Sequence, residues 1–349
     1  MKIMQSRFAQ RLLTWIHTPT SWLFAILVFL CAFGLVAWGS LALYWSNLPW
    51  SELRVVAAAV FALFGIWALW LTCKSKMRFV FAALFLLVLA YWWMIPASHQ
   101  REWQTDVAVM PRAVIDGDRV LLKNVRNFHY TGRDEFTVKY EDREVLLSHL
   151  TGVDFFISYW MKGPVGHTFV SFIFDNAPPV SISIETRPET HEGFDPLASM
   201  FKQFELIYVV GDERDIVGVR TNHRKEDVFL YPVKVSAESA RALFLVYLER
   251  INELADRPEW YNLLSNNCTL NIVRYANRVG RADDFNIRHL LNGWIDAYLF
   301  NAGFLDTDLP FDEFRRLSHI NEAAQAAEGA PDFSERIRAH LPRPPEREK

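Results

Sequence analysis

Cys268 is the residue whose type and position most directly indicate chemistry in this chain. It follows the polar run Ser265-Asn266-Asn267 and precedes a helical pattern from Leu270 to Asn277. The N–H groups of a first helical turn and the helix dipole stabilise a thiolate, which is the nucleophilic form of cysteine. Cys268 is therefore a candidate nucleophile. The alternative is a small, buried apolar residue with a structural role.

The remaining cysteines exclude several other kinds of site. Cys31 and Cys73 lie in or beside apolar segments, so the rest of the chain holds one thiol and cannot form an internal disulfide. The sequence contains no glycine-rich phosphate loop, no dinucleotide-binding fingerprint, no His-Glu-x-x-His and no Cys-x-x-Cys. We therefore expect no metal and no cofactor.

A histidine that could assist the thiol lies in a predicted hairpin. The run from His167 to Phe174 ends at Asp175-Asn176-Ala177-Pro178-Pro179, which is turn chemistry, and the chain returns through Val180 to Arg187. With an odd-numbered loop, His167 lies opposite Glu185 or Arg187 on the same face. A carboxylate beside the imidazole could then orient it. The alternatives are a hydrogen-bonded strand histidine and an ordinary Glu185–Arg187 ion pair.

The elements that position these residues predict an α+β domain: an antiparallel sheet with packed helices. Helices are expected at Ala237 to Leu254, with Ser236 as its N-cap, at Cys268, and from Pro310 to Ala327. The expected strands are Ala113 to Ile115, Arg119 to Val125, Phe136 to Tyr140, Val153 to Trp160, His167 to Phe174, Val180 to Arg187, Phe204 to Val210, Ile216 to Thr221 and Val228 to Val235.

Three long apolar runs precede this domain, within an expected membrane anchor of residues 1–101. They are residues 22–45, 55–71 and 79–96, each near the roughly 20 residues that span a bilayer, with the second and third slightly short. The alternative is a buried helical core in a soluble protein. Aromatic residues flank the expected outer ends, which is typical of membrane interfaces.

The distribution of basic residues predicts the orientation of the spans. Lysines and arginines gather in the N-terminal segment and in the loop between the second and third runs: Lys2, Arg7, Arg11, Lys74, Lys76 and Arg78. The positive-inside rule then places the N-terminus in the cytoplasm and the domain, residues 102–341, on the other side of the membrane. Residues 342–349 are expected to be a disordered tail. The net charge of -3 over 349 residues argues against a nucleic-acid partner.

Five short motifs occur in an order that resembles one bacterial family. They are Val125-Arg126-Asn127-Phe128, Gly166-His167-Thr168-Phe169-Val170-Ser171-Phe172, Ser183-Ile184-Glu185-Thr186-Arg187, Phe204-Glu205-Leu206-Ile207-Tyr208 and Asn266-Asn267-Cys268-Thr269. From roughly Ala113 to Arg281 the chain resembles the Lnb N-terminal periplasmic domain family, a bacterial domain of unknown function whose named member is a lipoprotein N-acyltransferase. The order of histidine and cysteine also resembles the permuted papain-like fold of NlpC-type enzymes.

This resemblance implies roles for individual residues. Cys268 would be the nucleophile, His167 the base, and Glu185 an orienting or substrate-binding group. Residues implied to bind substrate or support the site are Arg187, Asn266, Asn267 and Thr269. The named acyltransferase is larger and has a different membrane region, so its exact substrate is not carried over.

Three functions follow from these observations. The first is acyl transfer through a Cys268 thioester, with membrane phospholipid and lipoprotein as partners. The second is hydrolysis of a lipid or a peptidoglycan peptide by the same residues. The third is a non-enzymatic, membrane-anchored binding domain in which Cys268 is structural.

Overall fold

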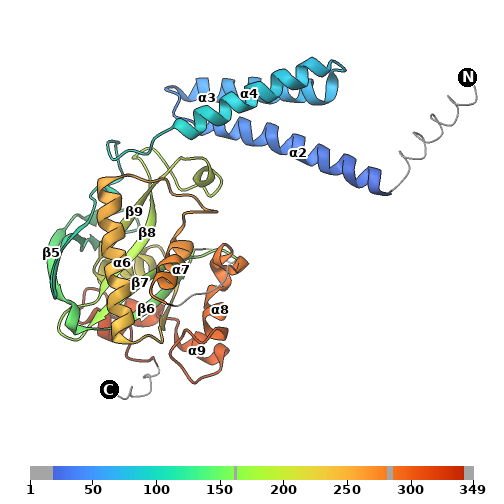
Figure 1. The fold of residues 1–349 in the computed structure, drawn as a ribbon. Helices are drawn as coiled ribbons and strands as arrows, with labels where there is room; N and C mark the ends of the chain where they lie inside the picture. Colours follow the sequence, from blue (N-terminus) through green and yellow to red (C-terminus); the bar gives the residue numbers. More distant parts are fainter. Residues whose placement is uncertain (1–18, 161–162, 281–285, 342–349) are drawn as a thin grey trace, which may run out of the picture. The chain divides into compact units, whose positions relative to one another are not determined.

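The structure is a computed structural model that describes residues 19–160, 163–280 and 286–341. It forms two compact units (Figure 1). One comprises Met1–Pro96 with Phe201–Gln203, and the other comprises Ala97–Met200 with Phe204–Lys349. The basic residues expected near the N-terminus and the expected tail at 342–349 lie outside the described residues.

Three apolar helices make up most of the first unit. They are α2 (Pro19–Tyr44), α3 (Ser51–Ile66), which the π-helical turn η1 (Trp67–Leu71) extends, and α4 (Ser75–Met94). They provide candidate membrane spans of 23, 21 and 20 residues, each long enough for a bilayer. The three predicted spans are confirmed as helices. The second and third are longer than expected because each helix begins before its apolar run.

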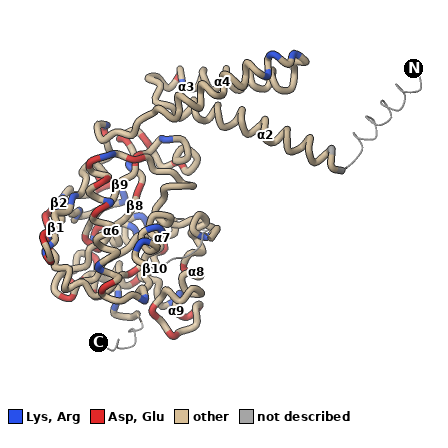
Figure 2. The backbone as a smooth tube through the Cα atoms, in the orientation of Figure 1, with Lys and Arg blue, Asp and Glu red and all other residues tan. Residues whose placement is uncertain are grey.

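Glycines allow these helices to approach one another closely. A Cβ on Gly39 of α2 would lie 2.5 Å from the ring of Phe61 on α3. A Cβ on Gly65 of α3 would lie 2.8 Å from the ring of Phe81 on α4. Small residues at such contacts are typical of helices packed in an apolar environment. Charged residues lie at the ends and turns of the helices rather than along their middles (Figure 2).

An eight-stranded sheet organises the described part of the second unit. Its order is β1-β2-β9-β8-β7-β6-β10, with β5 paired to β2. The strands are β1 (Arg112–Asp116), β2 (Arg119–Arg126), β5 (Tyr140–Leu146), β6 (Leu150–Tyr159), β7 (His167–Phe174), β8 (Val180–Arg187), β9 (Glu205–Gly211) and β10 (Asp227–Pro232). A separate small sheet pairs β3 (His129–Tyr130) with β4 (Phe136–Thr137).

The sheet is mixed rather than wholly antiparallel. Most neighbouring strands are antiparallel, as expected, but β2 and β9 are parallel where Arg126 meets Gly211. A side chain at Gly211 would be too close to its neighbours, because a Cβ there would lie 2.8 Å from Ile216 and 3.0 Å from the carbonyl oxygen of Arg126. The α+β prediction is confirmed, with this change to the sheet.

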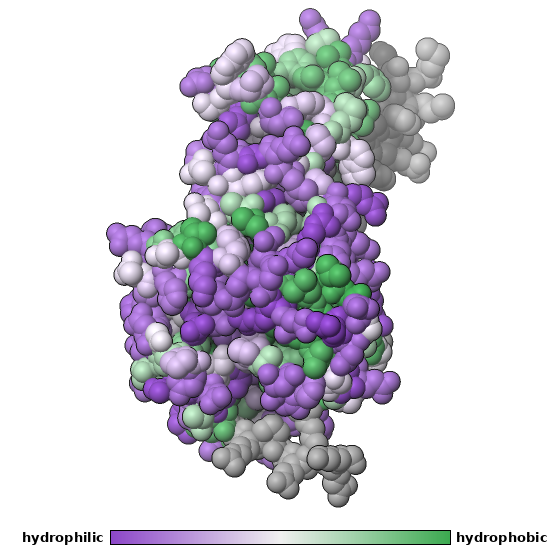
Figure 3. Space-filling model, turned by 90° about the vertical axis from the view of Figure 1, so that its left-hand side faces the viewer, coloured by the Kyte–Doolittle hydropathy of each residue, from purple (hydrophilic) through white to green (hydrophobic). Residues whose placement is uncertain are grey.

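Helices cover both faces of the sheet. α6 (Ala237–Asp256) begins at the predicted N-cap Ser236 and packs on one face together with α7 (Cys268–Arg278). The opposite face carries an apolar cluster shared with the C-terminal helices α10 (Asn321–Ala326) and α11 (Phe333–Arg336). Most of the surface of this unit in Figure 3 is hydrophilic, as expected for a domain in water.

One predicted strand is helical in the structure. Residues 216–221, expected to be extended, form the end of α5 (Glu213–Ile216) and part of the π-helical turn η5 (Val219–His223). The helix begins there because Asp212 caps it, accepting a hydrogen bond from the N–H of Arg214 at 3.0 Å.

The helix predicted from Pro310 to Ala327 is two helices, α9 (Phe311–Leu317) and α10. Between them the carbonyl of Ser318 accepts a hydrogen bond from the N–H of Leu230 in β10. The N–H of Ile320 donates to the carbonyl of Val228 in the same strand. Pairing with β10 thus interrupts the helix. Between α7 and α9 lie η6 (Ile287–His289), η7 (Asn292–Trp294) and α8 (Ile295–Asn301).

Candidate active site

Cys268 is the first residue of α7, as predicted. Asn267 caps this helix, since its side-chain oxygen accepts a hydrogen bond from the N–H of Leu270 at 2.8 Å. Asn266 accepts a hydrogen bond from the side chain of Asn271 at 2.9 Å. Both asparagines therefore hold the turn that presents Cys268, which is a supporting role.

The thiol of Cys268 is buried, and its pKa is lower than that of an ordinary thiol. The residue is only 4% exposed. Burial by itself would raise the pKa of the thiol, but the charge and hydrogen bond of His167, helped by hydrogen bonds from Thr168, lower that pKa from 9.0 to about 6. The group is therefore mostly thiolate at neutral pH.

His167 is the first residue of β7, and the hairpin has one of the two registers expected from the sequence. The loop covers residues 175–179, and the pairing of Phe169 with Ser183 places His167 opposite Glu185. The Nε2 atom of His167 is hydrogen-bonded to the Oγ of Ser183 at 2.7 Å and lies 3.9 Å from a carboxylate oxygen of Glu185. The structure thus brings His167, Glu185 and Cys268 together.

Glu185 is paired with Arg220, a residue that the sequence did not identify as part of the site. Arg220 donates a hydrogen bond to the Glu185 carboxylate at 2.7 Å, and it lies 3.9 Å from Glu226. Burial would raise the pKa of Glu185, but Arg220, and then His167, hold this pKa well below its usual range. Glu185 therefore remains a carboxylate, which can orient the imidazole and stabilise its protonated form.

Arg187 lies away from this group. Its guanidinium donates hydrogen bonds to the carbonyls of Val107 and Ala108 at 2.9 and 2.6 Å, and it covers the ring of Trp103. The Glu185–Arg187 ion pair considered from the sequence is wrong, because Arg220 takes the place of Arg187. The carbonyls that bind Arg187 belong to the segment before β1, which strand spacing alone does not reveal.

Asn292 of η7 joins the loop before β7 to α7. Its side-chain oxygen accepts from the N–H of Gly166 at 2.8 Å, and its nitrogen donates to the carbonyl of Gly166 at 2.7 Å and to Oγ1 of Thr269 at 2.8 Å. The same nitrogen lies 4.0 Å from the sulfur of Cys268. Thr269 is also hydrogen-bonded to Thr168 at 2.9 Å. These bonds fix the position of the thiol relative to the start of β7.

Tyr261 places a phenol beside the sulfur. Burial, with the nearby Cys268, raises the pKa of Tyr261 well above its usual value, so the phenol stays protonated. Its oxygen is also hydrogen-bonded to the backbone of Cys268. The N–H of Cys268 is the donor of this hydrogen bond, which leaves the phenol O–H of Tyr261 as a donor for an oxyanion formed at Cys268. In the described ranges, no group of three His, Cys, Asp or Glu residues could hold a metal ion.

The Val125–Phe128 motif supports the sheet rather than the thiol. Arg126 forms a buried ion pair with Asp215 at 2.8 Å, and Asp215 also accepts a hydrogen bond from the N–H of Phe128 at 2.8 Å. This pairing connects β2 to α5. The motif therefore has a structural role.

A comparison with protein families identifies the larger unit. The model of the Lnb N-terminal periplasmic domain matches residues 136–317, which is just over half of the chain. The match begins after the Val125–Phe128 motif and extends beyond the expected end to include Asn292. The chain matches no curated protein and no solved structure at a significant level. With three apolar helices preceding this domain, the chain belongs to the Lnb N-terminal periplasmic domain family.

Proposed function

We propose that this protein is a membrane-anchored thiol acyltransferase that takes an acyl chain from a membrane phospholipid through a thioester on Cys268. The observation that carries the proposal is the buried thiol at the start of α7, whose pKa is lowered to about 6 beside His167. Such a thiolate attacks an ester carbonyl at neutral pH. The named member of the family, a lipoprotein N-acyltransferase, suggests an amine of a lipoprotein as the acceptor.

The first half-reaction forms the thioester. The Cys268 thiolate attacks the ester carbonyl of the phospholipid, and the phenol of Tyr261 donates a hydrogen bond to the resulting oxyanion. When the oxyanion collapses, the carbon–oxygen ester bond breaks. The leaving glycerol oxygen takes its proton from the protonated His167.

The second half-reaction returns the enzyme to its starting state. The acceptor amine attacks the thioester and gives a proton to the neutral His167, while the carbon–sulfur bond breaks and releases the Cys268 thiolate. Glu185, held by Arg220, stabilises the protonated imidazole in both halves. The order of His167 and Cys268, with α7 against β7 and β8, supports a permuted papain-like arrangement of the site.

Burial of the thiol favours transfer over hydrolysis. A thioester survives until the acceptor arrives only if water is kept away from it. The sulfur lies in a residue that is 4% exposed, next to the fully buried hydroxyl of Thr168 and the 1% exposed Thr269. We therefore place hydrolysis second.

The membrane helices would hold the domain close to its acyl donor. We propose that the N-terminus is cytoplasmic and that the domain lies in the periplasm, because Lys74 lies between α3 and α4, and Lys76 and Arg78 lie in the first turn of α4. A domain anchored in this way works at the membrane surface, where phospholipid is abundant.

Intact-mass analysis tests the proposal directly. The full-length protein is incubated with phospholipid vesicles, and the acyl adduct is assigned to a peptide after digestion. We expect the mass of one acyl group on Cys268 and none on this peptide in Cys268→Ser. A labelled acyl chain then distinguishes the outcomes: label on an amine acceptor supports transfer, and label released only as fatty acid supports hydrolysis. If Cys268→Ser processes the lipid as fast as the parent protein, the thiol mechanism is wrong.

A further inference from the structure

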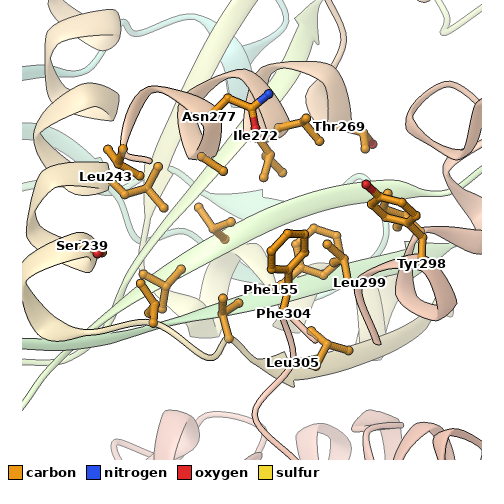
Figure 4. A pocket seen from close by; sticks show the side chains of 18 residues that line it. Phe155, Ser239, Leu243, Thr269, Ile272, Asn277, Tyr298, Leu299, Phe304 and Leu305 are labelled. Carbon is orange, nitrogen blue, oxygen red and sulfur yellow. The ribbon is translucent and has the colours of Figure 1, made fainter. Parts of the chain in front are cut away.

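An apolar pocket lies beneath α7 in the second unit (Figure 4). Its empty volume is about 850 Å³, part of which is open to solvent. It lies among α6, α7, α8 and strands β6 and β7. Its labelled ends in Figure 4 are Thr269 with Tyr298 on one side, and Ser239 with Leu243 on the other.

The lining is suited to a hydrocarbon. Most of the described lining residues are aliphatic or aromatic, and none of them carries a charge. Many are only partly buried, among them Leu243, Val273, Leu299 and Phe304. Apolar side chains that enclose an unfilled space gain free energy when another apolar group occupies it.

The pocket and the candidate active site share the first turn of α7. Thr269, which lines the pocket, follows Cys268 in the chain and is hydrogen-bonded to Asn292 and Thr168. Ile272, Val273 and Ala276 continue the same face of the helix, with the spacing expected of one helical side. An acyl chain that entered the pocket past Thr269 would begin one residue from Cys268 and extend along α7.

We propose that this pocket binds the hydrocarbon chain of the acyl group carried by Cys268, and that its far end limits the length of that chain. The inference rests on the proposed acyl transfer and adds the position and selectivity of the acyl chain. Ala276 and Leu243 lie toward the end opposite Thr269, so their sizes should set the limit. The polar part of the lipid would remain outside this pocket.

The test compares a variant that fills the far end with one that enlarges it. Full-length protein is incubated with mixed vesicles that hold equal amounts of phosphatidylethanolamine with lauroyl, myristoyl, palmitoyl and stearoyl chains, and the adducts on Cys268 are compared by mass. We expect Ala276→Phe to lower the ratio of stearoyl to lauroyl adduct by about tenfold, the effect of keeping roughly two methylene groups out of an apolar pocket. Leu243→Ala should raise that ratio, and the near-isosteric Ala276→Ser should leave it unchanged.

These opposite shifts separate selectivity from damage to the fold. A misfolded variant loses all adducts together, whereas a change in the pocket alters their ratio. Unchanged ratios in both Ala276→Phe and Leu243→Ala, with adducts still formed, would overturn the pocket proposal and leave the proposed function standing.

A second measurement tests the pocket even when no adduct forms. Cys268→Ala is placed in vesicles that contain a phospholipid with a photoreactive group near the end of its acyl chain. Crosslinks to Leu243, Val273 or Leu299 would support binding of the acyl chain in the pocket. This result is independent of the proposed function, which would be refuted if the parent protein formed no acyl adduct. Crosslinks confined to α2, α3 and α4 would overturn the pocket.

Discussion

Burial and ion pairing act in opposite directions on the thiol of Cys268. A buried thiol without partners has a raised pKa and is unreactive. Here His167 reverses that effect and lowers the pKa to about 6. Glu185 supports this interaction, because its carboxylate lies 3.9 Å from the imidazole. We therefore expect the reactivity of Cys268 to depend on His167.

This dependence predicts how Cys268 responds to pH. As the pH is lowered, the rate of alkylation of Cys268 by iodoacetamide should fall with a midpoint near pH 6, because only the thiolate reacts. In His167→Ala the midpoint should rise toward the ordinary pKa of a thiol. Mass spectrometry of the separated peptides distinguishes Cys268 from Cys31 and Cys73.

The same shift affects folding. A lowered thiol pKa stabilises the folded protein above the unfolded-state pKa, near 9.0, and this contribution is lost as the pH falls through about 6. Cys268→Ser should lack this part of the pH dependence.

An alkylation midpoint near 9 in the parent protein would contradict the activation of Cys268.

Removing the charge of Glu185 should lower the stability of the fold. Glu185→Gln leaves the guanidinium of Arg220, which is 3% exposed, without its closest carboxylate. We expect a loss of about 2 kcal/mol in the free energy of unfolding, measured by urea denaturation. The matched control is Glu144→Gln, which breaks the exposed Arg119–Glu144 pair and should cost much less stability than Glu185→Gln. Equal losses in the two variants would argue against a strong buried pair.

At the scale of elements, the site is assembled by a hairpin, a helix start and a short turn. The register of β7 and β8 places His167 beside Ser183 and Glu185. The cap of α7 places Cys268, and η7 connects the two. Gly293 of η7 is packed so tightly that a Cβ there would lie 2.5 Å from the carbonyl carbon of Pro164. The turn therefore packs directly against the segment before β7, with no room for a side chain at this position.

The turn can be tested through Asn292. Asn292→Ala removes the hydrogen bonds to both backbone groups of Gly166 and to Thr269, which should lower the free energy of unfolding by about 2 kcal/mol. If Asn292 positions the thiol, the alkylation midpoint of Cys268 should also rise. Asn292→Asp keeps the acceptor for the Gly166 N–H but loses the donor, so an intermediate stability is expected. A stability loss with an unchanged midpoint would assign Asn292 a purely structural role.

At the scale of the whole molecule, the chain combines one unit whose surface suits a lipid bilayer with one whose surface suits water. The first carries three helices long and apolar enough to cross a membrane. The second contains a sheet covered on both faces and a largely hydrophilic surface (Figure 3). An acyltransferase that uses membrane lipid needs both properties in one chain, since its donor is in the bilayer and its chemistry requires a structured site.

Reporter fusions test the orientation of the helices. Alkaline phosphatase fused after Arg101 should be active, because we expect that position to lie outside the cytoplasm. The same reporter fused after Lys74 should be inactive, and a fluorescent protein fused there should be bright. The reverse pattern would place the domain in the cytoplasm and remove the periplasmic part of the proposed function.

The sequence determined those features that depend on neighbouring residues. Apolar length predicted the three apolar helices, and the Asn-Asn-Cys pattern predicted the start of α7. Alternation and turn residues predicted the β7–β8 hairpin but left two registers open. These patterns are local, because hydrophobic spacing and capping act within a few residues. They were sufficient to select Cys268, His167 and Glu185.

Tertiary structure alone decided which distant groups complete the site. Arg220 replaced Arg187 as the partner of Glu185 because a predicted strand is a helical segment that carries Arg220 to β8. Asn292 contacts Gly166 across 126 residues, and no spacing rule connects positions so far apart. The apolar pocket likewise exists only where α6, α7, α8 and the sheet meet. Such contacts depend on how elements pack, and local patterns carry no information about packing partners.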